Sequence, residues 1–314
     1  MSRGQKSFLL HGGLVALLFA LQFVLPDYHH GNLARIMVLS VYAMGFNILF
    51  GYTGLLSLGH AMFFAAGMYG MGLAMQHGDV SAAPALLIGL VCALALSAIA
   101  GFLALRTTGV AFMIVTLMFS QAAWLTILYF TQWTRGDEGL VIQQARRAIA
   151  GIDLSDATNR YLAALILFAL VLIATSRLIQ APFGRVLVAI RENEERTRLL
   201  GYDVFAHKLG AVILSGTISG ASGAAYGLLF GYVGASFASV QYSIFPLVWV
   251  LLGGAGTIIG PFIGTLFMFY LIDIASGLTS AYMLVVGAVL VLLTLFARAG
   301  IAGEIRRRLL PWLP

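Results

Sequence analysis

This sequence has little charge and almost no cysteine. Only 10% of its 314 residues are charged and 61% are hydrophobic, which leaves too little polar surface to cover a water-soluble globule of this size. The single cysteine, Cys92, excludes an intramolecular disulfide and a cysteine-rich metal cluster. The histidines are scattered, so we expect no metal site, no catalytic constellation and no cofactor. We therefore expect lipid to cover most of the surface.

A Gly-x-x-x-x-Gly-Lys-Ser/Thr loop for nucleotide phosphates is also missing. We predict that the chain is not an enzyme and that any ATP hydrolysis linked to it occurs on a separate chain. The net charge of +6 does not indicate a nucleic-acid partner, because the basic residues lie at the ends of apolar stretches and in loops. They form no continuous patch that could follow a phosphate backbone.

Apolar stretches long enough to cross a hydrocarbon core recur from one end of the chain to the other. A core of about 30 Å needs about 20 apolar residues per helix, and alternating β-barrel segments are absent. We predict an all-α integral membrane protein, a polytopic helical bundle of about ten (8–10) transmembrane helices. The predicted crossings are 8–25, 33–50, 59–75, 84–105, 109–130, 161–179, 209–232, 245–272 and 281–297.

Basic residues predict the orientation of these crossings. Arg3 and Lys6 place the amino terminus in the cytoplasm, and the residues after the first crossing lack a small-x-small cleavage site, so this helix is expected to be uncleaved. Nine crossings would export Arg298 and the cluster Arg306, Arg307 and Arg308, against that orientation. We predict that 245–272 is two discontinuous helices, which makes about ten crossings with both termini cytoplasmic. One kinked crossing with an exported terminus is the alternative.

Two glycine-rich breaks interrupt the apolar pattern. The first follows the second predicted crossing and has no charge beside it, and the second lies inside 245–272. Lipid-exposed backbone cannot tolerate such breaks, so we expect both to be sheltered by neighbouring helices and to act as hinges. Their residues are Gly51, Gly54, Gly253, Gly254, Gly256, Gly260 and Pro261.

Two polar segments exceed the length of ordinary connections. Residues 131–160, predicted to be external, contain four acidic residues and four arginines. Loops of this length usually have a function. Three interpretations are possible: a docking surface for an external partner, a lid over a pore mouth, or a solvated linker with a short surface helix.

The second segment, 180–208, is predicted to be cytoplasmic. A polar helical pattern begins after Pro182 and ends at Gly201, where a residue of unrestricted φ can close a helix. It is either a solvated helix held by its own i,i+3 and i,i+4 ion pairs or a projection that fits a groove of a soluble partner. The residues that would make that contact are Gly184, Arg185, Arg191, Glu192, Glu194, Glu195, Leu199, Leu200 and Gly201.

Polar residues inside apolar stretches are candidates for a translocation pathway, because their burial must be compensated by other helices, water or a solute. They are Ser57, His60, Thr116, Ser120, Gln121, Ser219 and Asp273. For the serine stripe around Ser219, close helix packing is an alternative. A structural hydrogen bond is the alternative for His60, and a position at the membrane interface is the alternative for Asp273.

Four segments together resemble one family, the LivM-type permease subunits of ATP-binding-cassette importers for branched-chain amino acids. They are Gly51–Phe64, Thr134–Leu140, Phe183–Gly201 and Gly253–Pro261. The resemblance covers roughly residues 35 to 297, although Arg135 stands where the family pattern has glycine.

This resemblance implies a single transmembrane permease domain over residues 1–314 in a bacterial inner membrane. It implies four kinds of partner: a homologous LivH-type permease, two cytoplasmic ATP-binding subunits, a periplasmic solute-binding protein, and membrane lipid. The segment 180–208 would be the cytoplasmic coupling segment, and the chain would form the pathway for branched-chain or other small apolar amino acids. An ion-coupled secondary transporter and a permease for urea or short amides are the alternatives.

Overall fold

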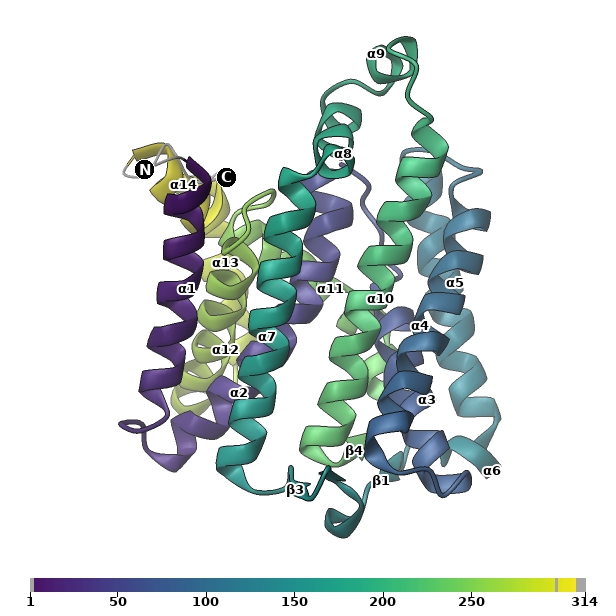
Figure 1. Ribbon diagram of the computed structural model, residues 1–314, viewed down its shortest axis with the longest axis vertical. Helices are drawn as coiled ribbons and strands as arrows, with labels where there is room; N and C mark the ends of the chain where they lie inside the picture. Colours follow the sequence, from purple (N-terminus) through teal and green to yellow (C-terminus); the bar gives the residue numbers. More distant parts are fainter. Residues whose placement is uncertain (1–2, 297–298, 309–314) are drawn as a thin grey trace.

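A computed structural model describes residues 3–296 and 299–308 (Figure 1). The long helices lie side by side in one bundle. They are α1 (Arg3–Leu21), α2 (Asp27–Asn47), α3 (His60–His77), α4 (Ala82–Ala104), α5 (Val110–Tyr129), α7 (Ala157–Gln180), α10 (Val204–Phe230), α11 (Val240–Gly253), α12 (Gly260–Leu278) and α13 (Tyr282–Phe296). Six segments, namely α4, α5, α7, α10, α12 and α2 with its continuation to Tyr52, are long and apolar enough to cross a membrane. The prediction of an all-α, multi-pass membrane protein is confirmed at this level.

Shorter elements lie at the two ends of the bundle. The short helices are α6 (Thr131–Thr134), α8 (Pro182–Glu192), α9 (Glu194–Leu199) and α14 (Gly300–Arg308), with one π-turn, η1 (Ile48–Tyr52), and two 3-10 turns, η2 (Gln144–Arg146) and η3 (Ala235–Ala238). The strands are β1 (Leu140–Val141), β2 (Ala148–Ile149), β3 (Ile152–Asp153) and β4 (Tyr232–Val233). β1 pairs antiparallel with β4, and β2 with β3.

Helix α8, helix α9, the start of α1 and helix α14 lie at one end of the bundle, which we call the α9 end (Figure 1). The strands and α6 lie at the opposite end, which we call the β1 end. The residues between Thr131 and Arg160 are not an irregular loop throughout, because they contain α6 and the strands β1, β2 and β3. Strand β1 pairs with β4, directly after α10, in the register Leu140↔Val233.

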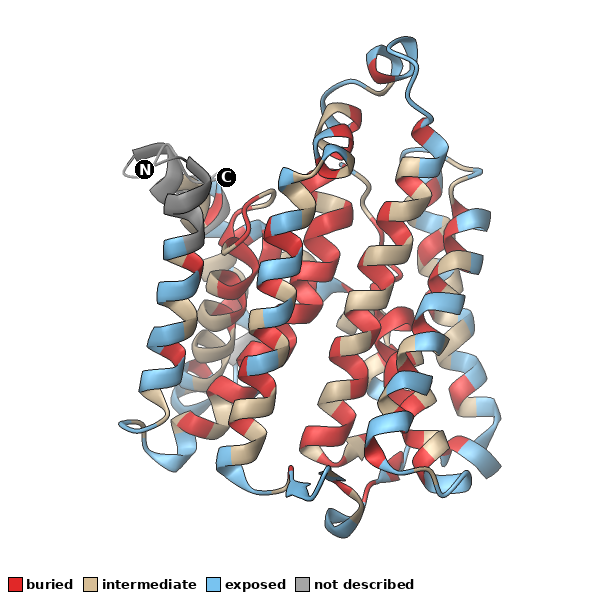
Figure 2. Cartoon of the chain, viewed as in Figure 1, coloured by how far each residue is buried: buried red, intermediate tan, exposed pale blue. Residues whose placement is uncertain are grey.

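Helix α2 is the centre of the bundle. Helices α7, α10, α11 and α12 all pack against it, and from Leu33 to Leu49 every residue except Arg35 is buried (Figure 2). A helix that is apolar all round needs protein on every side, and this arrangement supplies it.

Glycines allow α10 to lie very close to its neighbours. A Cβ at Gly67 of α3 would collide with the backbone of Gly220, and one at Gly223 would collide with the backbone of Phe64. Ser215 and Ser222 of α10 donate hydrogen bonds to carbonyl oxygens of α2, at 2.5 Å and 2.6 Å. The serine and glycine stripe therefore has a packing role, as small residues do where helices meet inside lipid.

Two predicted boundaries need correction. Helix α2 begins at Asp27 and not at residue 33, with Pro26 as the extended residue just before its first turn. The polar pattern of 182–201 is not a single helix, because Asn193 is extended and separates α8 from α9. The break predicted inside 245–272 is present, since α11 ends at Gly253 and α12 begins at Gly260.

Candidate functional site

The two glycine-rich breaks, far apart in the sequence, meet at the α9 end of the bundle. Gly51 lies in η1 and Gly256 lies between α11 and α12. A Cβ added at Gly51 would lie 2.5 Å from the backbone nitrogen of Gly256 and would also collide with the side chain of Asn47. Only glycine permits the two backbones to approach this closely.

Asn47 ties the breaks together. Its amide nitrogen donates to the carbonyl oxygen of Thr257 at 2.8 Å, and its amide oxygen accepts from the backbone N–H of Gly256 at 3.0 Å. The amide nitrogen and the amide oxygen of this buried side chain thus both bond to the irregular segment between α11 and α12. These bonds satisfy backbone groups for which lipid offers no hydrogen-bond partner. Asn47 is not among the residues predicted from the sequence. Its polar side chain inside an apolar stretch, four residues before Gly51, was the available signal.

The turn between α11 and α12 has its own backbone requirements. Gly254 and Gly256 have φ values of 116° and 75°, which residues with a side chain rarely adopt. Thr257 closes the turn, because its hydroxyl donates to the Gly254 carbonyl at 2.7 Å and accepts from the Gly260 N–H at 3.1 Å. Pro261 occupies the start of α12, where its missing N–H has no consequence.

Arg191 connects α8 to both breaks. Its Nη1 donates to the carbonyl oxygen of Gly51. A Cβ at Gly54 would lie 3.0 Å from its Cγ, and a Cβ at Gly256 would lie 3.0 Å from its Nη1. Of the i,i+3 and i,i+4 ion pairs that a continuous helix would allow, those of Arg191 with Glu194 and Glu195 are not formed, because the helix is interrupted at Asn193. The pair of Glu194 with Arg198, which lies within α9, is formed. We call Asn47, Gly51, Arg191 and Gly256 the break junction.

The rest of the predicted coupling segment has a buried side and an exposed side. Gly184 packs against the backbone at the end of α7, and Val186, Leu187 and Ile190 of α8 are buried. Residues Arg185, Glu192, Glu195, Leu199 and Leu200 are exposed. Leu199 and Leu200 are 87% and 70% exposed, which is unusual for adjacent leucines outside a lipid-facing helix.

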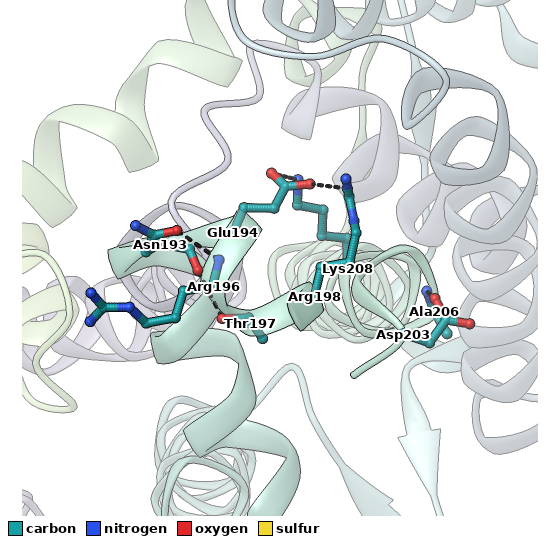
Figure 3. Close-up of polar contacts among 8 residues, drawn as sticks. All are labelled: Asn193, Glu194, Arg196, Thr197, Arg198, Asp203, Ala206 and Lys208. Atoms are coloured by element: carbon teal, nitrogen blue, oxygen red, sulfur yellow. Dashed lines mark hydrogen bonds and ion pairs between the residues drawn. The ribbon is translucent and has the colours of Figure 1, made fainter. Parts of the chain in front are cut away.

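Polar contacts hold α9 in place (Figure 3). Glu194 accepts from Lys208 at 2.5 Å and from Arg198 at 3.2 Å, and the side chain of Asn193 caps α9 by accepting from the N–H of Arg196 at 2.8 Å. Gly201, at φ 89°, follows the end of α9 as predicted. Glu194 is therefore engaged within the chain, whereas Glu195 has no ion pair among the described residues.

A cavity of about 680 Å³ lies beside the break junction. Its walls come from the segment after η1, the turn between α4 and α5, and the chain from Ile190 to Lys208. Arg191, Glu192, Glu194, Arg198 and Lys208 all line it, so the cavity is strongly polar on one side.

Three predicted pathway residues lie near one another, at the start of α3. Ser57 is buried and accepts from the N–H of Gly59, and Thr116 of α5 accepts from the N–H of Leu58, both at 3.2 Å. His60 Nε2 lies 2.7 Å from Ser215 Oγ. Because Ser215 donates its hydrogen to Gly45, Nε2 of His60 must carry a proton and donate. His60 thus has a structural hydrogen bond.

The other predicted pathway residues are dispersed. Ser120 and Ser219 are fully buried with no hydrogen-bond partner among the described residues, and Gln121 is partly exposed on α5. Asp273 lies apart from them all, in the last two turns of α12, where Tyr28 at the start of α2 donates to its carboxylate at 2.7 Å. Among the described residues, no group of three or more His, Cys, Asp or Glu could hold a metal ion.

Comparison with known proteins identifies relatives over almost the whole chain. Residues 30–294 match the family described as branched-chain amino acid transport system / permease component. The high-affinity branched-chain amino acid transport system permease protein LivM of Salmonella typhimurium strain LT2 is 27% identical over 329 residues, covering 97% of this chain and 76% of that protein. LivM of Escherichia coli K12 is 27% identical over 328 residues with the same coverage.

A shorter match is found in an archaeon. A probable branched-chain amino acid transport permease protein LivM of Methanocaldococcus jannaschii is 35% identical over 98 residues, which cover 31% of this chain and 28% of that protein. No solved structure matches. Since the family match spans most of the chain and the similarity to LivM proteins spans 97% of it, this chain belongs to the family of branched-chain amino acid transport permeases.

Proposed function

We propose that this chain is the membrane-spanning permease subunit of an ATP-driven importer and forms part of the pathway for branched-chain amino acids. The family match and the LivM relatives support the solute class and the kind of transporter. The observation within the structure that supports coupling is the contact of Arg191 with both helix breaks. A motion of α8 and α9 would reach the interior of the bundle through this contact.

We assign the α9 end to the cytoplasm and the β1 end to the outside. The basic residues of 180–208 favour this orientation by the positive-inside rule. Helices α1, α2, α3, α4, α5, α7, α10, α11, α12 and α13 would then make ten crossings, with both termini cytoplasmic. The residues around Arg298 that entered the sequence argument lie partly outside the described residues.

The exposed side of α9 is the proposed contact for a cytoplasmic ATP-binding subunit. Leu199 and Leu200 supply an apolar surface, and Arg185, Glu192 and Glu195 supply charges that set the orientation of a partner. The chain has no phosphate-binding loop of its own, so two such partners would supply ATP hydrolysis.

Helix α5 is the proposed contact for the second, homologous permease. Only 17% of its apolar stretch is buried within the protein, against 89% for the apolar stretch of α2. Gln121 is partly exposed on this helix and has no hydrogen bond within the described chain. A polar side chain on a lipid-facing helix is costly, which favours a protein or water-filled surface here. The solute-binding protein would dock at the β1 end.

Reconstitution tests the proposal directly. The chain would be placed in liposomes with its second permease, its two ATP-binding subunits and its solute-binding protein, and leucine uptake would be measured with urea as a competitor. Uptake should require both ATP and the binding protein, and urea should not compete. Uptake by the chain alone under a proton or sodium gradient would instead establish an ion-coupled carrier. The position of Asp273 near the end of α12 does not favour that mechanism, which usually places its ion site at the middle of the membrane.

A further inference from the structure

Arg35 is an exception in the central helix. Every other residue of α2 and η1 from Leu33 to Leu49 is buried, whereas Arg35 is exposed. Helices α7 and α10 pack on α2 but make few contacts with each other, and in Figure 1 α2 passes behind α7 and is visible between α7 and α10. The guanidinium carbon of Arg35 lies 5.2 Å from the ring centre of Phe230, the last residue of α10. The bundle is therefore open to its side at Arg35.

Two further arginines share this place. The guanidinium carbon of Arg160, in the first turn of α7, lies 5.7 Å from the same Phe230 ring. Arg147 donates to the carbonyl oxygen of Leu229 at 3.3 Å and lies against Gly231. Arg35 and Arg147 are both close enough to Arg160 for their charges to oppose its own. We call these three residues the arginine cluster.

The acidic residues nearby do not neutralise the arginine cluster. None of its three side chains forms an ion pair with an acid among the described residues. Asp156 attracts Arg160, but its carboxylate caps α7 by accepting from the N–H groups of Thr158 and Asn159 at 3.0 Å and 3.1 Å.

Asp153 is close enough to Arg147 for their charges to interact, and its carboxylate also accepts hydrogen bonds from within the chain. Hydrogen bonds from the hydroxyl and the backbone N–H of Ser155 lower the pKa of Asp153, with a smaller contribution from the charge of Arg147. His30 lies beside Arg160 and brings no negative charge. The arginine cluster thus carries three positive charges that no acid of the described residues meets in a direct ion pair.

Guanidinium groups bind the oxygens of phosphate and carboxylate in a bidentate manner, so the ligand that fits this cluster is an oxyanion. The position of Arg35 indicates where such an oxyanion comes from. It lies eight residues after the start of α2, about 12 Å along the helix axis, within a segment apolar enough to cross a membrane. The outward side of Phe230 is occupied by the β1–β4 pair, with Ile142 donating to the Gly231 carbonyl.

The opening therefore lies at the side of the bundle and not at its β1 end. We propose that the arginine cluster binds the phosphate of an anionic phospholipid in the leaflet at the β1 end. Basic pockets between membrane helices are suited to such headgroups, and long basic side chains reach headgroup depth while their stems stay in apolar surroundings. This site does not depend on which solute the chain carries.

Native mass spectrometry of the full-length chain in detergent tests the site, with phosphatidylglycerol and phosphatidylcholine of equal acyl length as probes. The unmodified chain should bind phosphatidylglycerol in preference. The double variant Arg35→Gln, Arg160→Gln should bind it roughly thirtyfold more weakly, since each basic residue near an anionic headgroup contributes roughly fivefold. Binding of phosphatidylcholine should change far less.

Two further variants make the result specific. Arg135→Gln removes the same charge from an exposed position at the β1 end, outside the cluster, and should keep the preference. Arg35→Lys keeps the charge but not the planar group, so its preference for phosphatidylglycerol should lie between those of the unmodified chain and the double variant. An unchanged melting temperature of the double variant excludes misfolding as the cause of its loss. Equal binding of the two lipids, or an unchanged preference in the double variant, would overturn the proposal. So would weaker docking of the solute-binding protein to Arg35→Gln with phosphatidylglycerol binding unchanged, because the cluster would then be a protein contact.

Discussion

Arg191 is an exposed residue of α8 whose guanidinium reaches back to the break at Gly51. It donates to the carbonyl oxygen of Gly51 and touches Gly54 and Gly256, so both breaks depend on one guanidinium. A hydrogen bond from a charged donor contributes about 1.5–3 kcal/mol, which is large enough to bias a conformational equilibrium between two states.

We expect Arg191→Gln to uncouple ATP hydrolysis from transport. In the reconstituted transporter, the stimulation of ATPase activity by loaded binding protein should fall by about tenfold or more, following the loss of that hydrogen bond. Arg191→Lys should restore part of it, since it keeps the charge but not the planar group. Arg106→Gln, at the turn between α4 and α5, is the matched control. Stimulation that stays at its original level in Arg191→Gln would show that the contact does not transmit the signal.

Glycine spacing sets how closely the helices approach. A Cβ at Gly67 would collide with the backbone of Gly220, whereas a Cβ at Gly12 of α1 would meet nothing within 4 Å. We expect Gly67→Ala to lower stability by about 1–3 kcal/mol through overpacking, and Gly12→Ala to be neutral or slightly stabilising because alanine favours the helix. Thermal unfolding in detergent measures both. Equal melting temperatures for the two variants would mean that α3 and α10 can separate without loss.

At the scale of the element, α9 is held by ion pairs within the chain, and its other side is exposed. Glu194 accepts from Lys208 and Arg198, so reversing its charge would break internal contacts as well as any contact with a partner. Glu195 is exposed and unpaired among the described side chains, which makes it the cleaner position to test.

We expect Glu195→Lys to weaken association with the ATP-binding subunits at least about tenfold, because like charges facing one another across an interface cost several kcal/mol. Co-purification of the subunits from membranes provides the measurement. Glu138→Lys, an exposed acid at the β1 end, changes the net charge equally and should leave association intact. If both variants behave alike, α9 is a solvated helix held by its own ion pairs, which is the other interpretation of this segment.

For the whole molecule, the number of crossings follows from the pair α11 and α12. If they are two crossings, Leu278 at the end of α12 faces outward; if 245–272 were one crossing, it would face the cytoplasm. We expect a single cysteine at Leu278, in a Cys92→Ser background, to react with an impermeant maleimide added outside cells. A cysteine at exposed Ile152 should also react, and one at Leu200 should react only after the membrane is opened. Reaction of the Leu278 variant only from inside would establish the single kinked crossing.

Composition and pattern determined much of this protein without any structure. A hydrophobic content of 61% requires lipid around the chain, because polar surface is too scarce to face water. The two glycine-rich breaks and the charged segment 180–208 were identified because each interrupts an apolar pattern, and interruptions are visible in one dimension. The locations of the long helices followed from the length that a bilayer demands.

Only the tertiary structure decided which of these features touch. It brings Gly51 against Gly256 through Asn47, sends Arg191 into that junction, and gathers three arginines around Phe230. It also divides 182–201 at Asn193, so the predicted ion pairs that would span the division are absent, while the Glu194–Arg198 pair within α9 is formed. Hydrophobic periodicity reports how each segment faces lipid or protein, but many helix arrangements bury the same apolar area. Contacts between distant polar groups depend on which arrangement is adopted, and that information lies in the packing of the helices.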